Sequence, residues 1–193
     1  MKDFSTTDQR GRNLLHLAAE FSTPALKSLL KKKVLDVNAA DASGNTPIHY
    51  AAYSHDIQRV ELLLGAGASI RSVNNGGMNC LHLTCSKQVA VAQKSFEKLL
   101  ELFASYDLHP FNRNADGASA AHLAVGSSNV LAIQFFIEKQ FFLIDYPNGF
   151  AHSLLLLLYF LVPCFLTKIL KTEMETLACI LLLEPKILTW FPN

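Results

Sequence analysis

The hydrophobic positions of the chain fall into repeating units, and each unit contains two apolar stretches separated by polar residues. The first stretch follows a glycine-containing turn and ends in small residues, as in Ala18-Ala19 and Ala51-Ala52. The second stretch is spaced like the buried face of a helix. These second stretches are Leu26–Leu30, Val60–Leu64, Phe96–Leu100 and Ile133–Ile137. The pattern predicts a turn, a short helix, a loop, a longer helix and an extended return in every unit.

One short motif marks the start of every first stretch. Its four copies are Asn13-Leu14-Leu15-His16, Thr46-Pro47-Ile48-His49, Asn79-Cys80-Leu81-His82 and Ser119-Ala120-Ala121-His122. Successive histidines are 33, 33 and 40 residues apart. A glycine stands five residues before each histidine, at Gly11, Gly44, Gly77 and Gly117. An Asp or Asn stands three residues before each glycine, at Asp8, Asp41, Asn74 and Asn114. Self-similarity at a fixed period indicates stacked repeats.

Each position of the motif has a physical reason. An Asp or Asn followed by Gly favours a tight turn, because Gly accepts a positive φ and the Asx side chain bonds its own backbone. The small polar residue that opens each motif copy is of a type that caps helices. Pro47 fits the first turn of a helix, where its missing N–H costs nothing. Gly65-Ala66-Gly67 is expected to end the second helix of its unit.

The period and the words around the four histidines resemble the ankyrin repeat, most closely from Asp41 to Ala52. The resemblance covers about residues 5–148, within a domain of residues 1–148. Its repeats lie at about 8–40, 41–73, 74–113 and 114–145. It implies an all-α fold, an α-solenoid of stacked helix-turn-helix repeats with β-turn or hairpin connections. The third repeat is seven residues longer than the second, which we attribute to an insertion near Lys87–Lys94, between its helices.

The composition limits the classes of function. Half of the 193 residues are hydrophobic and 17% are charged, so the chain can bury a core. Its net charge of +1 argues against a nucleic-acid binder that depends on phosphate contacts. The basic run Lys31-Lys32-Lys33 lies where a helix should end, where it suits the helix dipole. The N-terminus lacks an apolar signal core, so we expect the protein in the cytoplasm or nucleus.

The sequence suggests no catalytic, cofactor-binding or metal site. In the repeat resemblance the histidines bond locally and have a structural role. Neighbouring repeats stack roughly 10 Å apart, too far for histidines of two repeats to share a metal at about 2 Å. Cys80 and Cys85 occupy packed helical positions and are expected to be buried thiols. Phosphate-loop and nucleophile-elbow motifs are absent from the sequence, so we expect no enzyme.

The repeat resemblance implies that another protein binds at the turn tips and the inner helix face. The candidate contact residues are Arg10, Arg12, Phe21, Asn45, Tyr53, Met78 and Lys87. Aromatic residues and arginines often dominate binding energy, because they bury much area for little lost side-chain freedom. We therefore expect the contacts to lean toward the first three repeats. Two alternatives stay open: Phe21 seals the end of its helix, and the arginines form a solvated tip.

Residues 149–193 form a hydrophobic C-terminal segment that is expected to be helical. Residues 146–167 contain no Asp, Glu, Lys or Arg. Three interpretations remain: a degenerate fifth repeat, a membrane-spanning segment at about 150–170, and a tail outside the native fold. The sequence therefore predicts a protein-interaction adaptor or inhibitor. The alternative is a membrane-anchored protein whose ankyrin-like repeats face the cytosol.

Overall fold

The computed structural model describes residues 6–89 and 91–139, which belong to the first of the two units of the chain, residues 1–144. These residues form helices and contain no β-strand, in agreement with the predicted all-α fold. The helices are α1 (Leu14–Phe21), α2 (Thr23–Lys32), α3 (Pro47–Tyr53), α4 (Ile57–Gly65), α5 (Cys80–Cys85), α6 (Gln93–Ser105), α7 (Ala120–Gly126) and α8 (Val130–Glu138). The predicted hydrophobic helical segment, 149–193, lies outside the described residues.

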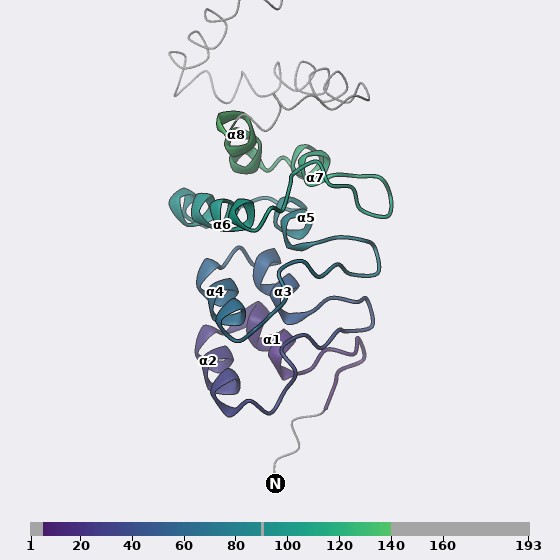
Figure 1. Cartoon of the computed structure of the whole chain (residues 1–193), viewed down its shortest axis with the longest axis vertical. Coiled ribbons are helices and arrows are strands. Elements are labelled where there is room, and N and C mark those ends of the chain that lie inside the picture. The colour runs from purple at the N-terminus through teal and green to yellow at the C-terminus, as the bar shows by residue number, and fades with distance from the viewer. Residues whose placement is uncertain (1–5, 90, 140–193) are drawn as a thin grey trace, which may run out of the picture. The chain divides into compact units, whose positions relative to one another are not determined.

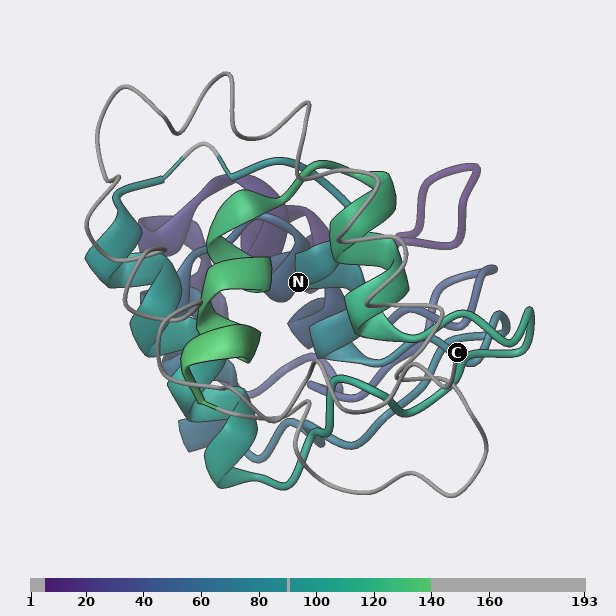
Figure 2. The same cartoon turned by 90° about the horizontal axis from the view of Figure 1, so that it is seen from above.

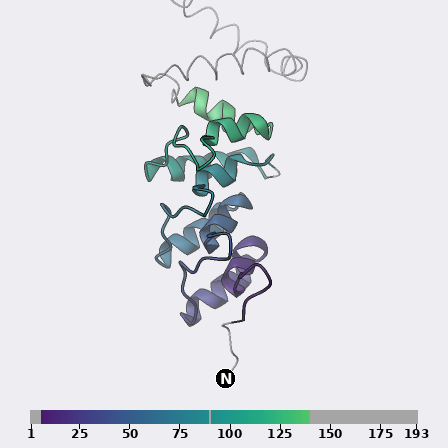
Figure 3. The ribbon, with the colours of Figure 1, turned by 90° about the vertical axis from the view of Figure 1, so that its right-hand side faces the viewer.

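The helices form two layers that run through the described repeats. The shorter helices α1, α3, α5 and α7 contact one another in order, and so do α2, α4, α6 and α8 (Figure 1). Seen from above, the loops that connect successive repeats gather on one side of the helices (Figure 2). The view from that side shows the helical pairs following one another along the described part of the chain (Figure 3). Each pair therefore buries its apolar sides against its neighbours.

The shorter helices begin where the sequence predicts. Their N-caps are Asn13, Thr46, Asn79 and Ser119, each with a histidine three residues later that accepts the backbone N–H of the cap. α3 starts at Pro47, and α4 ends at Gly65. The basic run Lys31–Lys33 closes α2, as expected, with Lys33 in the left-handed conformation at a φ of 49°. These ends are fixed by local hydrogen bonds, which explains why a short motif predicts them.

The turns between repeats are closed hairpins built on the Asx residues. The carboxylate of Asp41 accepts the N–H groups of Ser43 and Asn45 at 2.8 Å each, and the Asn45 carbonyl accepts the N–H of Asp41 at 2.9 Å. The hairpins at Asp8, Asn74 and Asn114 repeat this arrangement. Successive tips also bond to each other, because Ala42 N–H donates to the Arg10 carbonyl at 2.9 Å. The tips of the hairpins at Asp8, Asp41, Asn74 and Asn114 therefore form one continuous row, which we call the hairpin row.

The third repeat accommodates its extra length in two places. The loop between α5 and α6 spans residues 86–92, whereas the loop between α3 and α4 spans residues 54–56. α6 has 13 residues, whereas α4 has 9. The predicted insertion between the helices is therefore only part of the explanation, because the second helix is longer as well. A longer helix adds apolar positions to the core, and Phe96, Leu99, Leu100 and Phe103 of α6 are all buried.

Candidate protein-interaction surface

Three of the repeated histidines, His16, His49 and His82, tie their helix starts to the next hairpin. The ring nitrogen Nδ1 of His49 accepts the N–H of Thr46 at 3.0 Å, so Nε2 carries the proton and donates to the Ser72 carbonyl at 3.1 Å. His16 and His82 make the same bonds to the hairpins that follow them. This structural role agrees with the one implied by the repeat resemblance. No cluster of metal-ligating side chains occurs among residues 6–89 and 91–139.

Burial keeps these histidines neutral. It lowers the pKa of His49 to about 4, although the nearby carbonyl groups of Ser72 and Met78 favour the charged form. The pKa values of His16 and His82 are lowered by burial too. Protonation would add a proton to Nδ1, which now accepts a hydrogen bond from the N–H of the N-cap. Two N–H groups would then face each other and the bond would be lost. The hairpin row therefore depends on neutral rings.

The two predicted cysteines are buried thiols, as expected. Cys80 and Cys85 are both fully buried. Burial raises the pKa of Cys80 to about 12 and also raises the pKa of Cys85. A thiol that stays protonated is a poor nucleophile, so these groups contribute packing rather than reactivity.

The predicted arginines at the first tip have different environments. Arg10 is exposed. Arg12 forms ion pairs with Asp8 at 2.8 Å and Glu20 at 3.0 Å, and its side chain is only 16% exposed. Its guanidinium also lies 5.7 Å from the centre of the Tyr50 ring. Arg12 therefore links the first hairpin tip to α1 and α3. Its charge is already paired, and little of its surface is accessible to a partner.

Tyr50 and Asp41 complete this network and were not among the predicted residues. The Tyr50 hydroxyl donates to the Asp41 carboxylate at 2.6 Å. Burial and this bond raise the pKa of Tyr50 to about 12. Burial alone would raise the pKa of Asp41, but bonds from Tyr50, Asn45 and Ser43 outweigh it and lower that pKa. The one signal in the sequence was a Tyr after the motif histidine, where the other three copies have Leu.

Two further predicted residues lie along the hairpin row. Asn45 is engaged within the row, because its amide donates to Asp41 at 3.4 Å and its side-chain oxygen accepts from Asn74 at 2.9 Å. Met78 is half-buried where the third hairpin closes, since its carbonyl accepts the N–H of Asn74 at 3.0 Å. Asn45 therefore joins hairpins to each other and offers little additional bonding capacity to a partner.

Tyr53 and Lys87 are brought together, although 34 residues separate them in the chain. The Lys87 ammonium lies 4.1 Å from the centre of the Tyr53 ring, and Tyr53 is 39% exposed. Partial burial lowers the pKa of Lys87, and the charge of Glu20 opposes this shift. We call this arrangement the Tyr53–Lys87 pair. It presents a cation held on an aromatic face.

Buried side chains that were not among the predicted residues fasten the end of α5 and the loop that carries Lys87. The Asn129 amide donates to the carbonyl groups of Thr84 at 3.3 Å and Lys87 at 3.0 Å. His55 donates to the same Thr84 carbonyl at 2.9 Å. His55 and Asn129 come from the second and fourth repeats, so the end of α5 is bonded from both sides, and Asn129 also holds the start of the long loop. Each stands outside the repeated motif, which gave no reason to select it.

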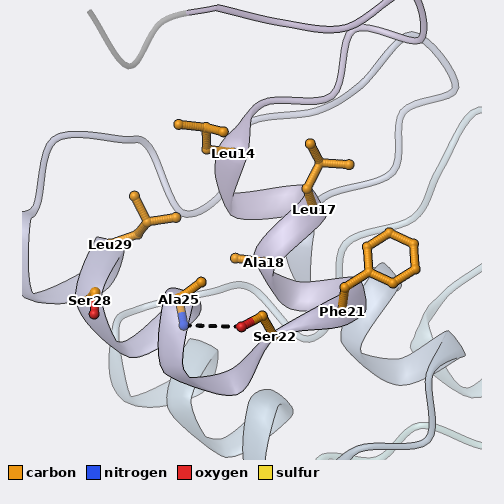
Figure 4. A pocket seen from close by; sticks show the side chains of 8 residues that line it. All are labelled: Leu14, Leu17, Ala18, Phe21, Ser22, Ala25, Ser28 and Leu29. Carbon is orange, nitrogen blue, oxygen red and sulfur yellow. Dashed lines mark hydrogen bonds between the residues drawn. The ribbon is translucent and has the colours of Figure 1, made fainter. Parts of the chain in front are cut away.

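Phe21 lines a groove between α1 and α2, which neither Tyr53 nor Lys87 lines (Figure 4). It is 71% exposed and therefore covers little of its own helix end.

Among the helices of residues 6–89 and 91–139, none has the length and apolar character needed to cross a membrane. The uncharged run 146–167 lies outside those residues.

Comparison with known proteins supports the repeat assignment. Residues 1–74 match the family model for ankyrin repeats in three copies. The chain is 34% identical over 126 residues to palmitoyltransferase AKR1 of Lachancea kluyveri, a match of 63% of this chain and 16% of that protein. It is 30% identical over 135 residues to ankyrin repeat domain-containing protein SAT10 of Stachybotrys chartarum, covering 69% of this chain and 7% of that protein. With the B-cell lymphoma 3 protein homolog of Mus musculus it shares 27% identity, over 68% of this chain and 30% of the relative.

Proposed function

Because the chain contains ankyrin repeats, we propose that it is an adaptor or inhibitor that binds a partner protein through its hairpin tips and the exposed residues of its short helices. Ankyrin repeats generally bind other proteins, and the repeat domain itself is non-catalytic. A continuous row of tips offers a long surface to such a partner. We place the protein in the cytoplasm or nucleus.

The observation that carries this proposal is the Tyr53–Lys87 pair. Its ammonium lies 4.1 Å above an exposed ring, and its loop is bonded to Asn129. A lysine held in one position loses less side-chain freedom when a partner binds than a free lysine does. Tyrosine is among the residue types that dominate the binding energy of protein interfaces. The pair is therefore our first choice for a contact that determines affinity.

Replacing Tyr53 by Ala, or Lys87 by Ala, should weaken partner binding about 10-fold or more, since a central contact contributes ~1.4 kcal/mol or more. A partner captured by the full chain and identified would be titrated against each variant. Tyr106→Ala is the matched control, because Tyr106 is 40% exposed but lies at the end of α6. Equal affinities for wild type, Tyr53→Ala and Lys87→Ala would reject the pair as a contact. Arg12 is unsuitable for this test, because its ion pairs support the fold.

The second candidate function is that of a membrane-anchored protein, with the repeats facing the cytosol. Two observations favour it: residues 146–167 carry no acidic or basic side chain except histidine, and one relative is named a palmitoyltransferase. The chain spans only 16% of that relative, so the enzymatic activity in the relative's name is not assigned to this protein. About 20 apolar residues suffice to span a bilayer.

Alkaline carbonate extraction of membranes from cells that express the full chain tests this anchor. The anchored form should remain in the membrane pellet. Leu156→Arg combined with Leu158→Arg should release it, because a charge at the bilayer centre costs about 3 kcal/mol per residue. Recovery of the wild-type chain in the soluble fraction would reject the anchor and leave the first proposal intact.

A further inference from the structure

The outer face of the first repeat is an open apolar groove. It has a volume of about 420 Å³ and is lined by Leu14, Leu17, Ala18, Phe21, Ser22, Ala25, Ser28 and Leu29 (Figure 4). None of these eight side chains is charged. Phe21 is 71% exposed and Leu14 is 36% exposed. The groove runs between α1 and α2, and we call it the α1–α2 groove.

The position of Leu14 is covered in the later repeats. Leu14 corresponds to Pro47 and Cys80, the first residues of α3 and α5, and both are buried. α1 packs against α2 and the following short helix α3, just as α3 packs against α4 and α5. What α3 has in addition is a preceding repeat. The exposure of Leu14 therefore comes from the absence of a preceding helical pair within the described residues.

The second helix gives the same result. Leu29 stands seven residues after the N-cap of α2, as Leu63 and Leu99 do in α4 and α6. Leu63 and Leu99 are fully buried, whereas Leu29 is only half-buried. The α1–α2 groove therefore resembles the surfaces that later repeats bury against a neighbouring helical pair. A helix with an apolar side would fit it best.

The charges beside the groove limit the occupant further. α2 contains Lys27, Lys31 and Lys32 and is capped by Lys33, and no acidic residue occurs in the helix. Lys32 follows Ser28 by four residues and Leu29 by three, so it continues their side of the helix. Two copies meeting through this face would bring these lysines together. A helix with acidic residues beside its apolar stripe would match them instead.

We propose that the α1–α2 groove is a second protein-binding surface, which takes an amphipathic helix with an apolar stripe and an acidic flank from a partner protein. Phe21 and Leu29 supply apolar contacts, and the positive charge of α2 attracts the acidic flank. This mode of binding places anchors at every third or fourth residue of the guest helix. Neither Tyr53 nor Lys87 lines this groove, so it is a separate surface from the Tyr53–Lys87 pair.

Two synthetic peptides test the proposal against the full chain. Each has about 18 residues, or five helical turns, with leucine at helical spacing on one side. One carries glutamates on the remaining positions, and its twin carries lysines. The glutamate peptide should bind at least 10-fold more tightly than the lysine peptide. Phe21→Ser and Leu29→Ser should each weaken the glutamate peptide at least 10-fold. Val73→Ser is the control, since Val73 is 57% exposed in another repeat, and this variant should bind like wild type.

Several outcomes would overturn the proposal. Equal binding of the two peptides, no binding of either, or unchanged binding by Phe21→Ser would each do so. A doubled mass of the wild-type chain in solution that Phe21→Ser abolishes would identify a second copy as the occupant. Sedimentation with phosphatidylcholine–phosphatidylserine vesicles that depends on Phe21, without peptide binding, would identify a lipid surface. Tyr53→Ala should leave peptide binding unchanged, so failure of this proposal and failure of the proposed function give different results.

Discussion

Lowering the pH from 7 to 4 is expected to remove about 3 kcal/mol of unfolding free energy through His49 alone. Burial lowers the pKa of His49 from 6.5 to about 4 in the folded protein. The unfolded chain therefore takes up a proton as the pH falls below 6.5, whereas the folded protein resists it until about pH 4. Each pKa unit of this difference corresponds to about 1.4 kcal/mol. Stability is full above pH 6.5 and is lost across the window from 6.5 to 4.

Other titrating groups change the stability of the protein over identifiable pH ranges. The lowered pKa values of His16, His55 and His82 add losses of the same sign below pH 6.5. The pKa of Asp41 is lowered from 3.8, so its contribution is present above pH 3.8 and is lost only at lower pH. A stability loss between pH 6.5 and 4 therefore reports on histidines rather than on carboxylates.

Urea unfolding of the full chain, followed by helical circular dichroism at several pH values, measures this loss. His49→Gln should be less stable than wild type at pH 7, because it loses the ring bonds to Thr46 and Ser72. It should also show a shallower fall between pH 6.5 and 4, since one titrating group is gone. A wild-type stability that stays constant over this window, or an undiminished slope in His49→Gln, would contradict the role assigned to the neutral ring.

Replacing Gly44 by Ala should destabilise the protein by about 3 kcal/mol. The backbone of Gly44 has a φ of +77°, which costs an L-residue roughly 1–2 kcal/mol. A Cβ added there would lie 2.8 Å from the backbone nitrogen of Asn75, and it would also meet the Asn75 side-chain oxygen. The next hairpin would have to move, which endangers the bond from Asn75 N–H to the Ser43 carbonyl. Such overpacking adds about 1–3 kcal/mol.

Gly67→Ala separates the two causes. Gly67 also has a positive φ, of +92°, but an added Cβ would meet nothing within 4 Å. Its cost should therefore be the backbone part alone, about 1–2 kcal/mol. The difference between the two variants in urea unfolding measures the close approach of neighbouring hairpins. Equal losses for Gly44→Ala and Gly67→Ala would show that the hairpin row tolerates the extra atom.

The sequence by itself determined the repeat and its local construction. The helix starts at Asn13 and Thr46, the Asx hairpins and the buried thiols follow from bonds between residues a few positions apart. The spacing that creates such a bond is visible in a short motif, and four copies in register repeat the evidence. The ankyrin resemblance implied local bonds of the motif histidines, and their bonds to the N-caps are of that kind. Their bonds to the carbonyl groups of the next hairpin came only from the structure.

Only the tertiary structure decided which candidate residues are available to a partner. Arg12 looked like a free tip residue, but Asp8 and Glu20 neutralise it within the fold. Tyr53 and Lys87 meet because Asn129, from another repeat, holds the long loop of the third repeat. Phe21 is 71% exposed and lines the groove between α1 and α2. Each outcome depends on contacts between residues far apart in the chain, and the periodic pattern carries no information about them.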